Sequence, residues 1–235
     1  MVPEISLVIT TYHRYETFLK ASLRRYLENP YIREIIIYDD HSSDYDKIRE
    51  DFKDEKIKLF QQPVNKGAFR NKLAAIAQAT CPWICLMDSD NFCDVDYFKA
   101  LYHYWHQYGA NPKCLYMPDY AMPQFNFTTN TIPINRQNWN KYHRTYDVML
   151  NAGNYVFHNT LVPYVLPIEY DPNLQECIHG FTEVKYMNYI WIRDADATIQ
   201  VVPNMRYQHA VHTGSLWMNT AQQCMDFNAN FNWTL

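Results

Sequence analysis

The sequence predicts an α/β fold in which a mostly parallel sheet is flanked by helices. Short apolar runs alternate with helical stretches through the first half of the chain, and each run ends in polar residues. Such runs are typical of parallel strands that are buried on both faces. Hydrophobic residues make up 48% of the 235 residues and charged residues 20%, which indicates a folded globular protein and excludes a disordered one.

The net charge, the absence of membrane and secretion signals and the cysteine spacing argue against several classes of protein. The net charge of -4 gives no general attraction for nucleic acid, so we do not expect a nucleic-acid partner. There is no apolar segment of about 18 residues and no N-terminal secretion signal, so a cytoplasmic location is expected. The six cysteines lack C-x-x-C spacing, which favours buried reduced thiols over structural zinc. The sequence is also compatible with a module of a longer polypeptide.

The first elements predict a βαβ unit. Residues 6–10 form a β-branched run, and the polar turn Thr11-Tyr12-His13-Arg14 follows it. Apolar residues then recur at helical spacing over 18–27, until Asn29-Pro30 ends the pattern. A second apolar strand over 35–38 comes next. Strand, helix and strand within about 35 residues is the unit from which parallel sheets are built.

The alternation continues to residue 109. We expect a charged helix over 44–54, a strand over 57–60, a helix over 68–77 and a buried strand over 83–87. Asp94 can cap the next helix, which Gly109 ends. The apolar face of that helix has i, i+3, i+4 and i+7 spacing and consists of Phe98, Leu101, Tyr102 and Trp105.

The second half has a less regular pattern. Strands are expected over 114–117, 154–158 and 199–202, and a helix over 181–193. Residues 118–139 are rich in Asn, Thr, Pro and aromatic residues, which predicts a long loop or hairpin of the kind that is often functional. The Asn-rich C-terminal tail has little pattern, and no helix is predicted there.

The stretch Asp88-Ser89-Asp90 directly follows the buried strand over 83–87. Open α/β sheets bind ligands at the carboxyl ends of their strands. Two carboxylates separated by one residue, with no nearby lysine to pair with, suit a hard divalent cation that carries a phosphate-bearing ligand. Two other strands end in Thr10-Thr11-Tyr12 and Asp39-Asp40. Parallel strands place all three turns at one edge of the sheet, so these residues can converge on one ligand.

A set of motifs in fixed order carries a family resemblance. The motifs are residues 8–14, residues 38–44, Asn65-Lys66-Gly67 with Arg70-Asn71, Asp88-Ser89-Asp90, residues 180–183 and residues 212–215. In order and spacing the sequence resembles the inverting family 2 glycosyltransferases of the GT-A fold. The resemblance implies a single domain over 1–235, with a mostly parallel nucleotide-binding sheet and a smaller mixed sheet on the acceptor side. It implies a nucleotide-sugar half over 1–112 and an acceptor half with the C-terminal segment over 113–235.

The resemblance also implies roles for the strand-end residues on the donor side. Thr10, Thr11 and Tyr12 would contact the nucleotide base, and Asp39 would accept a hydrogen bond from a ring N–H. The alternative for Asp39 is a solvated turn that caps a helix. Arg70 would reach the base or the diphosphate, because a planar guanidinium matches phosphate oxygens in pairs. The alternative for Arg70 is an exposed helix arginine.

The metal site implied by the resemblance involves the D-x-D and a C-terminal histidine. Asp88 would hold the ribose or a metal-bound water, with Ser89 beside it, and Asp90 would bind the metal directly. Mn²⁺ or Mg²⁺ fits these oxygen ligands, and zinc does not. His212 would add a further ligand, with His209 as the competing candidate and an ordinary hydrogen-bonding histidine as the alternative.

The catalytic base is the last implied role. An inverting transfer needs a group that takes the proton of the acceptor hydroxyl. Relatives carry an acidic pair, often Glu-Asp, at the start of the helix that Gly180 introduces here, and this chain has Thr182-Glu183. We place the base on Glu183, with a first-turn Glu that complements the helix dipole as the alternative. Asn154 and Trp191 are weaker candidates for acceptor contacts.

The resemblance therefore implies a metal-dependent transferase. It would move a sugar from a nucleotide-diphosphate sugar, most readily a UDP-sugar, to a hydroxyl of a carbohydrate acceptor by direct displacement with inversion. Two alternatives stay open. A sugar nucleotidyltransferase is less favoured because the turn Thr10-Thr11-Tyr12 has no glycine. A non-catalytic module that binds nucleotide sugars or glycans would bind without metal.

Overall fold

The computed structural model describes residues 4–170, 182–210, 212 and 216–235. One eight-stranded sheet has the order β3-β2-β1-β4-β7-β5-β6, and β8 pairs with β5 outside that path. The strands are β1 Ile5–Thr11, β2 Ile32–Asp39, β3 Ile57–Gln61, β4 Trp83–Asp88, β5 Cys114–Met122, β6 Phe125–Asn126, β7 Val156–His158 and β8 Thr198–Gln208. The predicted α/β class is confirmed, and the strands of the second half continue the same sheet.

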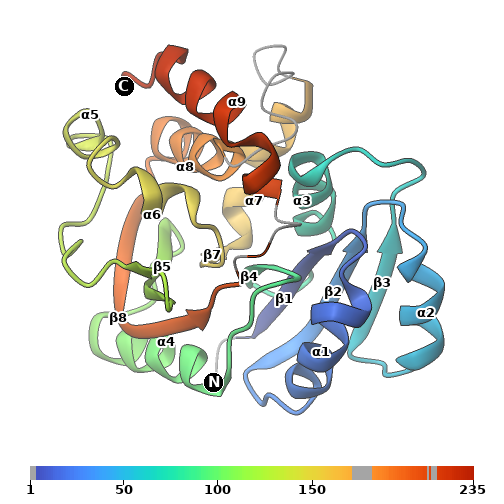
Figure 1. Ribbon diagram of the computed structural model, residues 1–235. Coiled ribbons are helices and arrows are strands. Elements are labelled where there is room, and N and C mark those ends of the chain that lie inside the picture. The colour runs from blue at the N-terminus through green and yellow to red at the C-terminus, as the bar shows by residue number, and fades with distance from the viewer. Residues whose placement is uncertain (1–3, 171–181, 211, 213–215) are drawn as a thin grey trace.

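Helices surround this sheet (Figure 1). In that view α1 and α2 lie beside β1 to β3, whereas α5, α6, α8 and α9 gather at the top of the molecule. The α-helices are α1 Lys20–Leu27, α2 Asp44–Asp51, α3 Ala68–Ile76, α4 Val95–Tyr108, α5 Trp139–Tyr142, α6 Asp147–Asn151, α7 Val162–Val165, α8 Thr182–Asp194 and α9 Leu216–Asn230. The shorter turns are η1 Tyr15–Leu19, η2 Asn159–Leu161 and η3 Leu166–Tyr170.

The parallel part of the sheet has the buried character that its sequence predicts. Every residue of β1 is buried, and so is every residue of β4 except Asp88. β1 pairs in parallel with β2 on one side and β4 on the other, and β2 pairs in parallel with β3. β7 is antiparallel to β4 and to β5, which makes the whole sheet mixed.

The strand register aligns the polar strand ends. Thr11 lies opposite Asp39 in the β1–β2 pair, and Thr10 lies opposite Asp88 in the β1–β4 pair. The backbone N–H of Asp40 then donates to the carbonyl of Thr11 at 2.9 Å, just beyond the strand ends. The prediction that the three turns share one edge of the sheet is confirmed.

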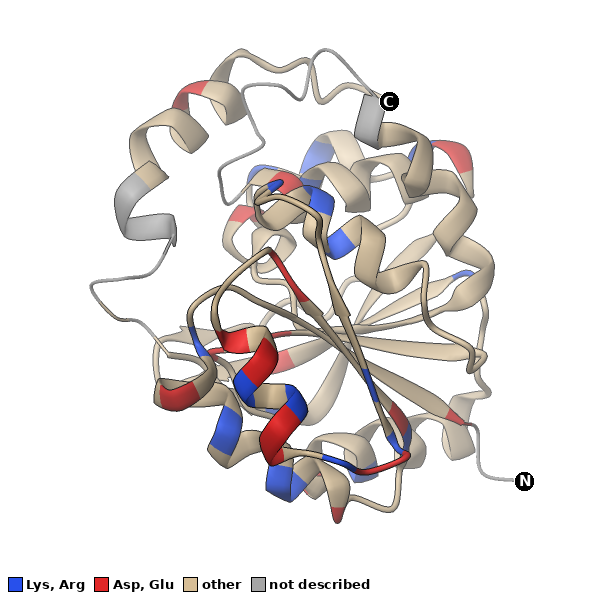
Figure 2. Ribbon diagram, turned by 90° about the vertical axis from the view of Figure 1, so that its right-hand side faces the viewer, with Lys and Arg blue, Asp and Glu red and all other residues tan. Residues whose placement is uncertain are grey.

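Several predicted element boundaries are also confirmed. The carboxylate of Asp94 accepts hydrogen bonds from the backbone N–H groups of Asp96 and Tyr97 and so caps α4. Gly109 follows α4 with a φ of 82°, a conformation that glycine adopts without strain. The predicted charged helix is α2, whose ribbon carries both acidic and basic residues in Figure 2.

One expectation for the second half needs correction. The tail contains a long helix, α9, although its Asn-rich sequence shows little apolar periodicity. In the segment over 118–139, where a long loop or hairpin is predicted, β5 continues to Met122 and β6 pairs with it, so the predicted hairpin is confirmed. The five described cysteines are buried free thiols, as predicted, and Cys177 lies outside the described residues. None of the helices in the described ranges has the length and apolarity that crossing a membrane requires.

Candidate active site

The turn after β4 brings Asp90 into contact with His212. The Nε2 atom of His212 lies 3.1 Å from Oδ2 of Asp90, and each side chain is about one-fifth exposed. His209 is instead packed against the rings of Phe125 and Tyr207. Of the two candidate histidines, His212 is therefore the one that contacts the D-x-D.

Backbone pairing explains why a C-terminal histidine reaches this turn. The backbone N–H groups of Phe92 and Gln208 each donate to the other residue's carbonyl, at 3.0 and 2.7 Å. The side-chain oxygen of Asn91 accepts the N–H of Ala210 at 3.0 Å. The segment after β8 is thus tied to the residues that follow Asp90, and His212 is two residues further on.

The electrostatic setting of Asp90 suits a cation. Burial raises the pKa of Asp90, the nearby charge of Asp88 adds to the rise, and His212 and Arg14 oppose it. A carboxylate that is both desolvated and close to a second carboxylate is stabilised by a positive charge. Within the described ranges there is no group of three His, Cys, Asp or Glu side chains that could hold a metal ion. Asp90 and His212 fit a divalent ion as a partial ligand set, which phosphate oxygens and water would complete.

A buried lysine connects the D-x-D to Glu183. The Nζ atom of Lys72, from α3, lies 2.9 Å from Oδ1 of Asp88 and 3.3 Å from Oε1 of Glu183. The side chains of Lys72 and Glu183 are 7% and 6% exposed, whereas that of Asp88 is 33% exposed. The expectation that Asp88 has no nearby lysine is therefore wrong, because Lys72 is distant in sequence and adjacent in space.

The carboxylate of Glu183 is only partly satisfied. Its Oε2 atom is buried and has no hydrogen-bond partner among the described residues. Burial raises the pKa of Glu183, and the charge of Lys72 opposes that rise. The buried hydroxyl of Tyr155, whose pKa is raised by burial and further by Asp88 and Glu183, also has no described partner. Orphaned buried polar groups and raised pKa values of this kind are enriched at functional sites.

The turn after β2 is held by its own hydrogen bonds. The carboxylate of Asp39 is fully buried and accepts hydrogen bonds from the N–H and Oγ of Ser42, both at 2.6 Å, and from Nε2 of Gln61 at 3.1 Å. Asp40 accepts the backbone N–H groups of Lys66 and Gly67, each at 2.8 Å. In this structure Asp39 therefore organises the turn, and its contact with a nucleotide base stays a prediction.

The remaining donor-side candidates surround the same edge. Thr10, Thr11 and Ser89 are buried, and Oγ1 of Thr11 has no described partner. Tyr12 is 45% exposed, and its ring packs against that of His13. Arg70 lies in α3 and is half-buried. Their binding roles remain predictions.

The two acceptor candidates are part of the protein's interior. Trp191 is fully buried, and its indole N–H donates to the carbonyl of Leu161 at 2.8 Å. It has no surface for a sugar, so the expectation of an acceptor contact is corrected to a core role. Asn154 is 1% exposed, and its side-chain oxygen accepts the N–H of Asp88 at 2.9 Å. Asn154 thus fixes the end of β4.

The sequence patterns do not indicate how three further residues, Lys72, Tyr155 and Arg14, act on the carboxylates of this site. Tyr155 lies in the strand predicted over 154–158 and Arg14 ends the motif over 8–14, but no spacing rule indicates the orphaned hydroxyl of Tyr155 or the effect of Arg14 on Asp90. Lys72 directly follows Arg70-Asn71 on α3. Its position next to that motif is the one signal that could have found it. Gly180, Phe181 and residues 213–215 lie outside the described residues.

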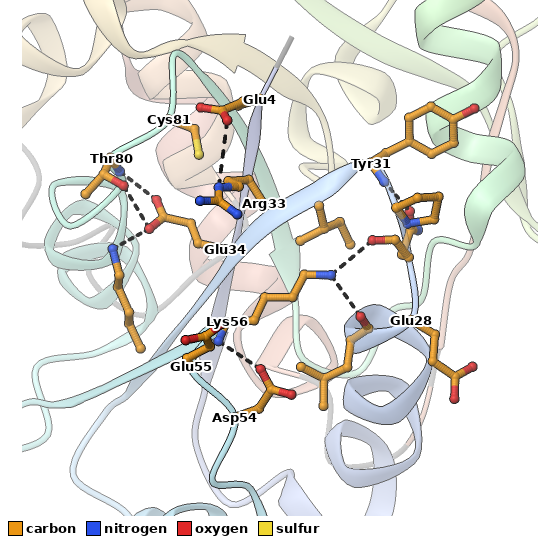
Figure 3. Close-up of a pocket in the computed structure, with 15 residues that line it drawn as sticks. Glu4, Glu28, Tyr31, Arg33, Glu34, Asp54, Glu55, Lys56, Thr80 and Cys81 are labelled. Carbon is orange, nitrogen blue, oxygen red and sulfur yellow. Dashed lines mark hydrogen bonds and ion pairs between the residues drawn. The ribbon is translucent and has the colours of Figure 1, made fainter. Parts of the chain in front are cut away.

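A cavity of about 860 Å³ lies at the opposite end of the parallel strands (Figure 3). There the ammonium of Lys56 donates to the carbonyls of Tyr26, Leu27 and Asn29. Glu34 is held by the side chain and backbone N–H of Thr80 and by Lys58. The ammonium of Lys56 and the carboxylate of Glu34 are thus hydrogen-bonded within the protein, whereas Oε2 of Glu183 has no partner among the described residues.

Comparisons with known proteins agree with this geometry. A family model described as glycosyl transferase family 2 matches residues 6–164, more than half of the chain. A comparison with curated proteins found no match. The fold is similar to that of S. aureus TarS 1-349 in complex with UDP, with 14% identity, a TM-score of 0.62, and coverage of 97% of this chain and 66% of that one.

Two further solved structures are similar. One is S. aureus TarS 1-349 in complex with UDP-GlcNAc, with 14% identity, a TM-score of 0.66, and coverage of 92% of this chain and 60% of that one. The other is GalNAc-T7 with UDP, GalNAc and Mn²⁺, with 15% identity, a TM-score of 0.66, and coverage of 91% and 44%. These GT-A structures establish the fold, and the chain spans less than two-thirds of the length of each.

Proposed function

Because the chain belongs to glycosyl transferase family 2, we propose that it transfers a sugar from a nucleotide-diphosphate sugar to a hydroxyl of a carbohydrate acceptor. A UDP-sugar is the favoured donor, since the similar TarS and GalNAc-T7 structures hold UDP or a UDP-sugar. The observation that carries the proposal is the contact of one lysine, Lys72, with both Asp88 and Glu183. It brings a donor-side carboxylate next to a buried glutamate.

In this proposal the reaction is a direct displacement with inversion. The acceptor oxygen forms a bond to the anomeric carbon while the bond from that carbon to the diphosphate breaks. The leaving nucleotide diphosphate takes the bonding electron pair. Glu183 accepts the hydroxyl proton, a contribution that is typically worth about 10²- to 10⁴-fold in rate. The raised pKa of Glu183 supports this role, because a base works best when its pKa lies nearer the working pH.

Asp90 and His212 would hold the divalent ion, Mn²⁺ or Mg²⁺. Their contact at 3.1 Å and partial exposure support a site that is open to phosphate oxygens. When bound, such an ion supplies Lewis-acid stabilisation of the negative charge on the leaving diphosphate. Asp88 is paired with Lys72, so in this proposal it orients the donor and is not a free metal ligand.

The test is a turnover assay. The protein is incubated with a panel of nucleotide sugars, acceptor glycans and Mn²⁺, and the release of nucleotide diphosphate is measured. We expect acceptor-dependent release by the wild type, a loss of release in Glu183→Gln, and retention in Glu34→Gln, a control glutamate at the other end of the strands. No release by wild type and Glu183→Gln alike, across all donors, would remove the proposal. The anomeric configuration of the product, read by NMR, tests inversion.

A further inference from the structure

Lys72 is a charged group in an enclosed position. Its side chain is 7% exposed, and its ammonium contacts Asp88 at 2.9 Å and Glu183 at 3.3 Å. Burial would lower the pKa of Lys72, but the two carboxylates outweigh burial and raise that pKa. A buried ammonium needs such counter-charges. Lys72 is therefore protonated and forms ion pairs with both carboxylates.

The helix that carries Lys72 is fixed to the sheet near the strand ends. Asp40, directly after β2, binds the N–H groups of Lys66 and Gly67, which precede α3. The side-chain amide of Asn71 donates to the carbonyl of Tyr38 at 2.9 Å. The residues that lead up to Lys72 are therefore tied to the end of β2 and to the residue directly after it, and the ammonium is presented from a helix that is anchored there.

The two oxygens of Glu183 have different surroundings. Oε1 accepts a hydrogen bond from Lys72, whereas Oε2 is buried and has no partner among the described residues. Leaving a buried carboxylate oxygen without a donor costs folding free energy, and native proteins seldom do so without a functional reason. Oε1 is therefore fixed by Lys72, whereas Oε2 can still accept a hydrogen bond or a proton.

We infer that Lys72 is a positioning residue for the proposed base, because its ammonium holds Oε1 of Glu183 and leaves Oε2 as the oxygen that accepts the acceptor's proton. The inference rests on the proposed function. It adds that the ammonium keeps the buried carboxylate ionised before the acceptor arrives. Lys72 acts through Glu183 and, in this inference, touches neither sugar.

Other charged and titratable groups around Glu183 do not replace Lys72. Asp88 from β4 is a second negative charge, and the hydroxyl of Tyr155 is neutral because its pKa is raised. Asp147 from α6 is bound by Lys185, which leaves that lysine engaged. α7 and α9 also pack against α8 and carry the titratable residues Tyr164, Cys224 and Asp226. In the described part of the chain, Lys72 is the cation that contacts Glu183.

The direct experiment measures the ionisation of Glu183. The protein is labelled with ¹³C at the glutamate carboxyls, and the Glu183 signal is assigned by its absence in Glu183→Gln. Its titration midpoint is then compared between the wild type and Lys72→Met. We expect the midpoint to rise by about 1 to 3 pH units, the range over which an adjacent opposite charge acts. Lys72→Gln, which is polar and neutral, is the second variant if Lys72→Met does not fold.

Two further variants separate positioning from a structural effect. Lys56→Met removes an ammonium at the opposite end of the strands and should leave the midpoint unchanged. Lys72→Arg keeps the charge and should return the midpoint toward that of the wild type. In the turnover assay, the acidic limb of the pH–rate profile should move up in Lys72→Met by the same amount as the NMR midpoint.

The outcomes are distinguishable from those for the proposed function. A midpoint in Lys72→Met or Lys72→Gln that equals that of Lys56→Met overturns the inference, even if the wild type transfers sugar. An absence of transfer by the wild type overturns the proposed function, and a raised midpoint in the same protein would still support the pairing of Lys72 with Glu183. The titration itself requires no turnover.

Discussion

Glu34 and Glu183 are both buried glutamates that contact a lysine, and they lie in opposite surroundings. Glu34, near the start of β2, accepts hydrogen bonds from Ser6, Lys58 and the side chain and backbone of Thr80. Among the side chains that the structure describes, Glu183 accepts a hydrogen bond from Lys72 alone, and Lys72 is shared with Asp88. Glu34 is therefore a structural carboxylate, whereas the carboxylate of Glu183 keeps one oxygen without a described partner.

The pKa values follow from this difference. Burial opposes ionisation of Glu34, but the hydrogen bonds from Lys58, Ser6 and Thr80 outweigh burial and lower the pKa to about 2. Burial raises the pKa of Glu183, and the single shared ammonium does not reverse the rise. A cavity of about 860 Å³ adjoins Glu34. The orphaned polar atoms of Glu183 and Tyr155 do not line this cavity.

The largest expected effect is that of Glu183→Gln on catalysis. The variant removes the proposed proton acceptor and keeps the shape of the side chain, so kcat should fall about 10²- to 10⁴-fold. Thermal stability should fall, because the buried ammonium of Lys72 loses one of its two counter-charges, and the remaining contact with Asp88 should keep the protein folded. Steady-state kinetics and a melting curve check the two parts. An unchanged kcat would show that Glu183 is not the base, and the proposed difference in role between Glu183 and Glu34 would then be wrong.

Trp191→Ala should mainly destabilise the fold. The indole is fully buried and its N–H is satisfied by Leu161, so truncation should lower the free energy of unfolding by about 3 to 5 kcal/mol. Chemical denaturation measures the loss. Activity per folded molecule at low temperature should change little, whereas a raised KM for the acceptor with unchanged stability would restore Trp191 to the acceptor site.

Glu34→Gln should have a smaller, pH-dependent effect on stability. The folded pKa of Glu34 is about 2 and its ordinary value is 4.5, so ionised Glu34 stabilises the folded state by about 3 kcal/mol at neutral pH. A lowered pKa gives stability that is complete above the unfolded value and is lost as the pH falls. The difference between wild type and Glu34→Gln should therefore shrink from pH 4.5 to pH 2.

Denaturation at a series of pH values checks this prediction, with kcat at neutral pH as the second measurement. Catalysis should be unaffected in Glu34→Gln. A stability difference that persists at pH 2, or a loss of catalysis without a loss of stability, would contradict the structural role of Glu34.

The sequence predicts the parallel part of the fold well, for a physical reason. β1 and β4 are buried on both faces, so their apolar runs are unbroken and their polar ends mark the edge of the sheet. The register that aligns Thr10 with Asp88 and Thr11 with Asp39 follows from parallel pairing. The D-x-D could therefore be placed beside the ends of β1 and β2 from the sequence pattern, whereas Glu183 joins them only through the family resemblance.

What the sequence misses depends on tertiary contacts. α9 has little periodicity of its own, and it is held by the bond from Lys185 to Asn228 and by aromatic contacts of Phe227 and Phe231. Lys72 lies 111 residues from Glu183, so no local spacing indicates their contact. The burial of Trp191 likewise depends on packing against Tyr155 and Phe157.

Calorimetry of UDP binding, in the presence and absence of Mn²⁺, tests directly whether the site at the strand ends binds a nucleotide together with a divalent ion. The account predicts Mn²⁺-dependent binding to the wild type and to Glu34→Gln, and its loss in Asp90→Ala, because Asp90 and His212 lie at the carboxyl ends of the strands. Removing Mn²⁺ with a chelator should reproduce the effect of Asp90→Ala. UDP binding that survives in Asp90→Ala and is lost in Glu34→Gln would contradict the account.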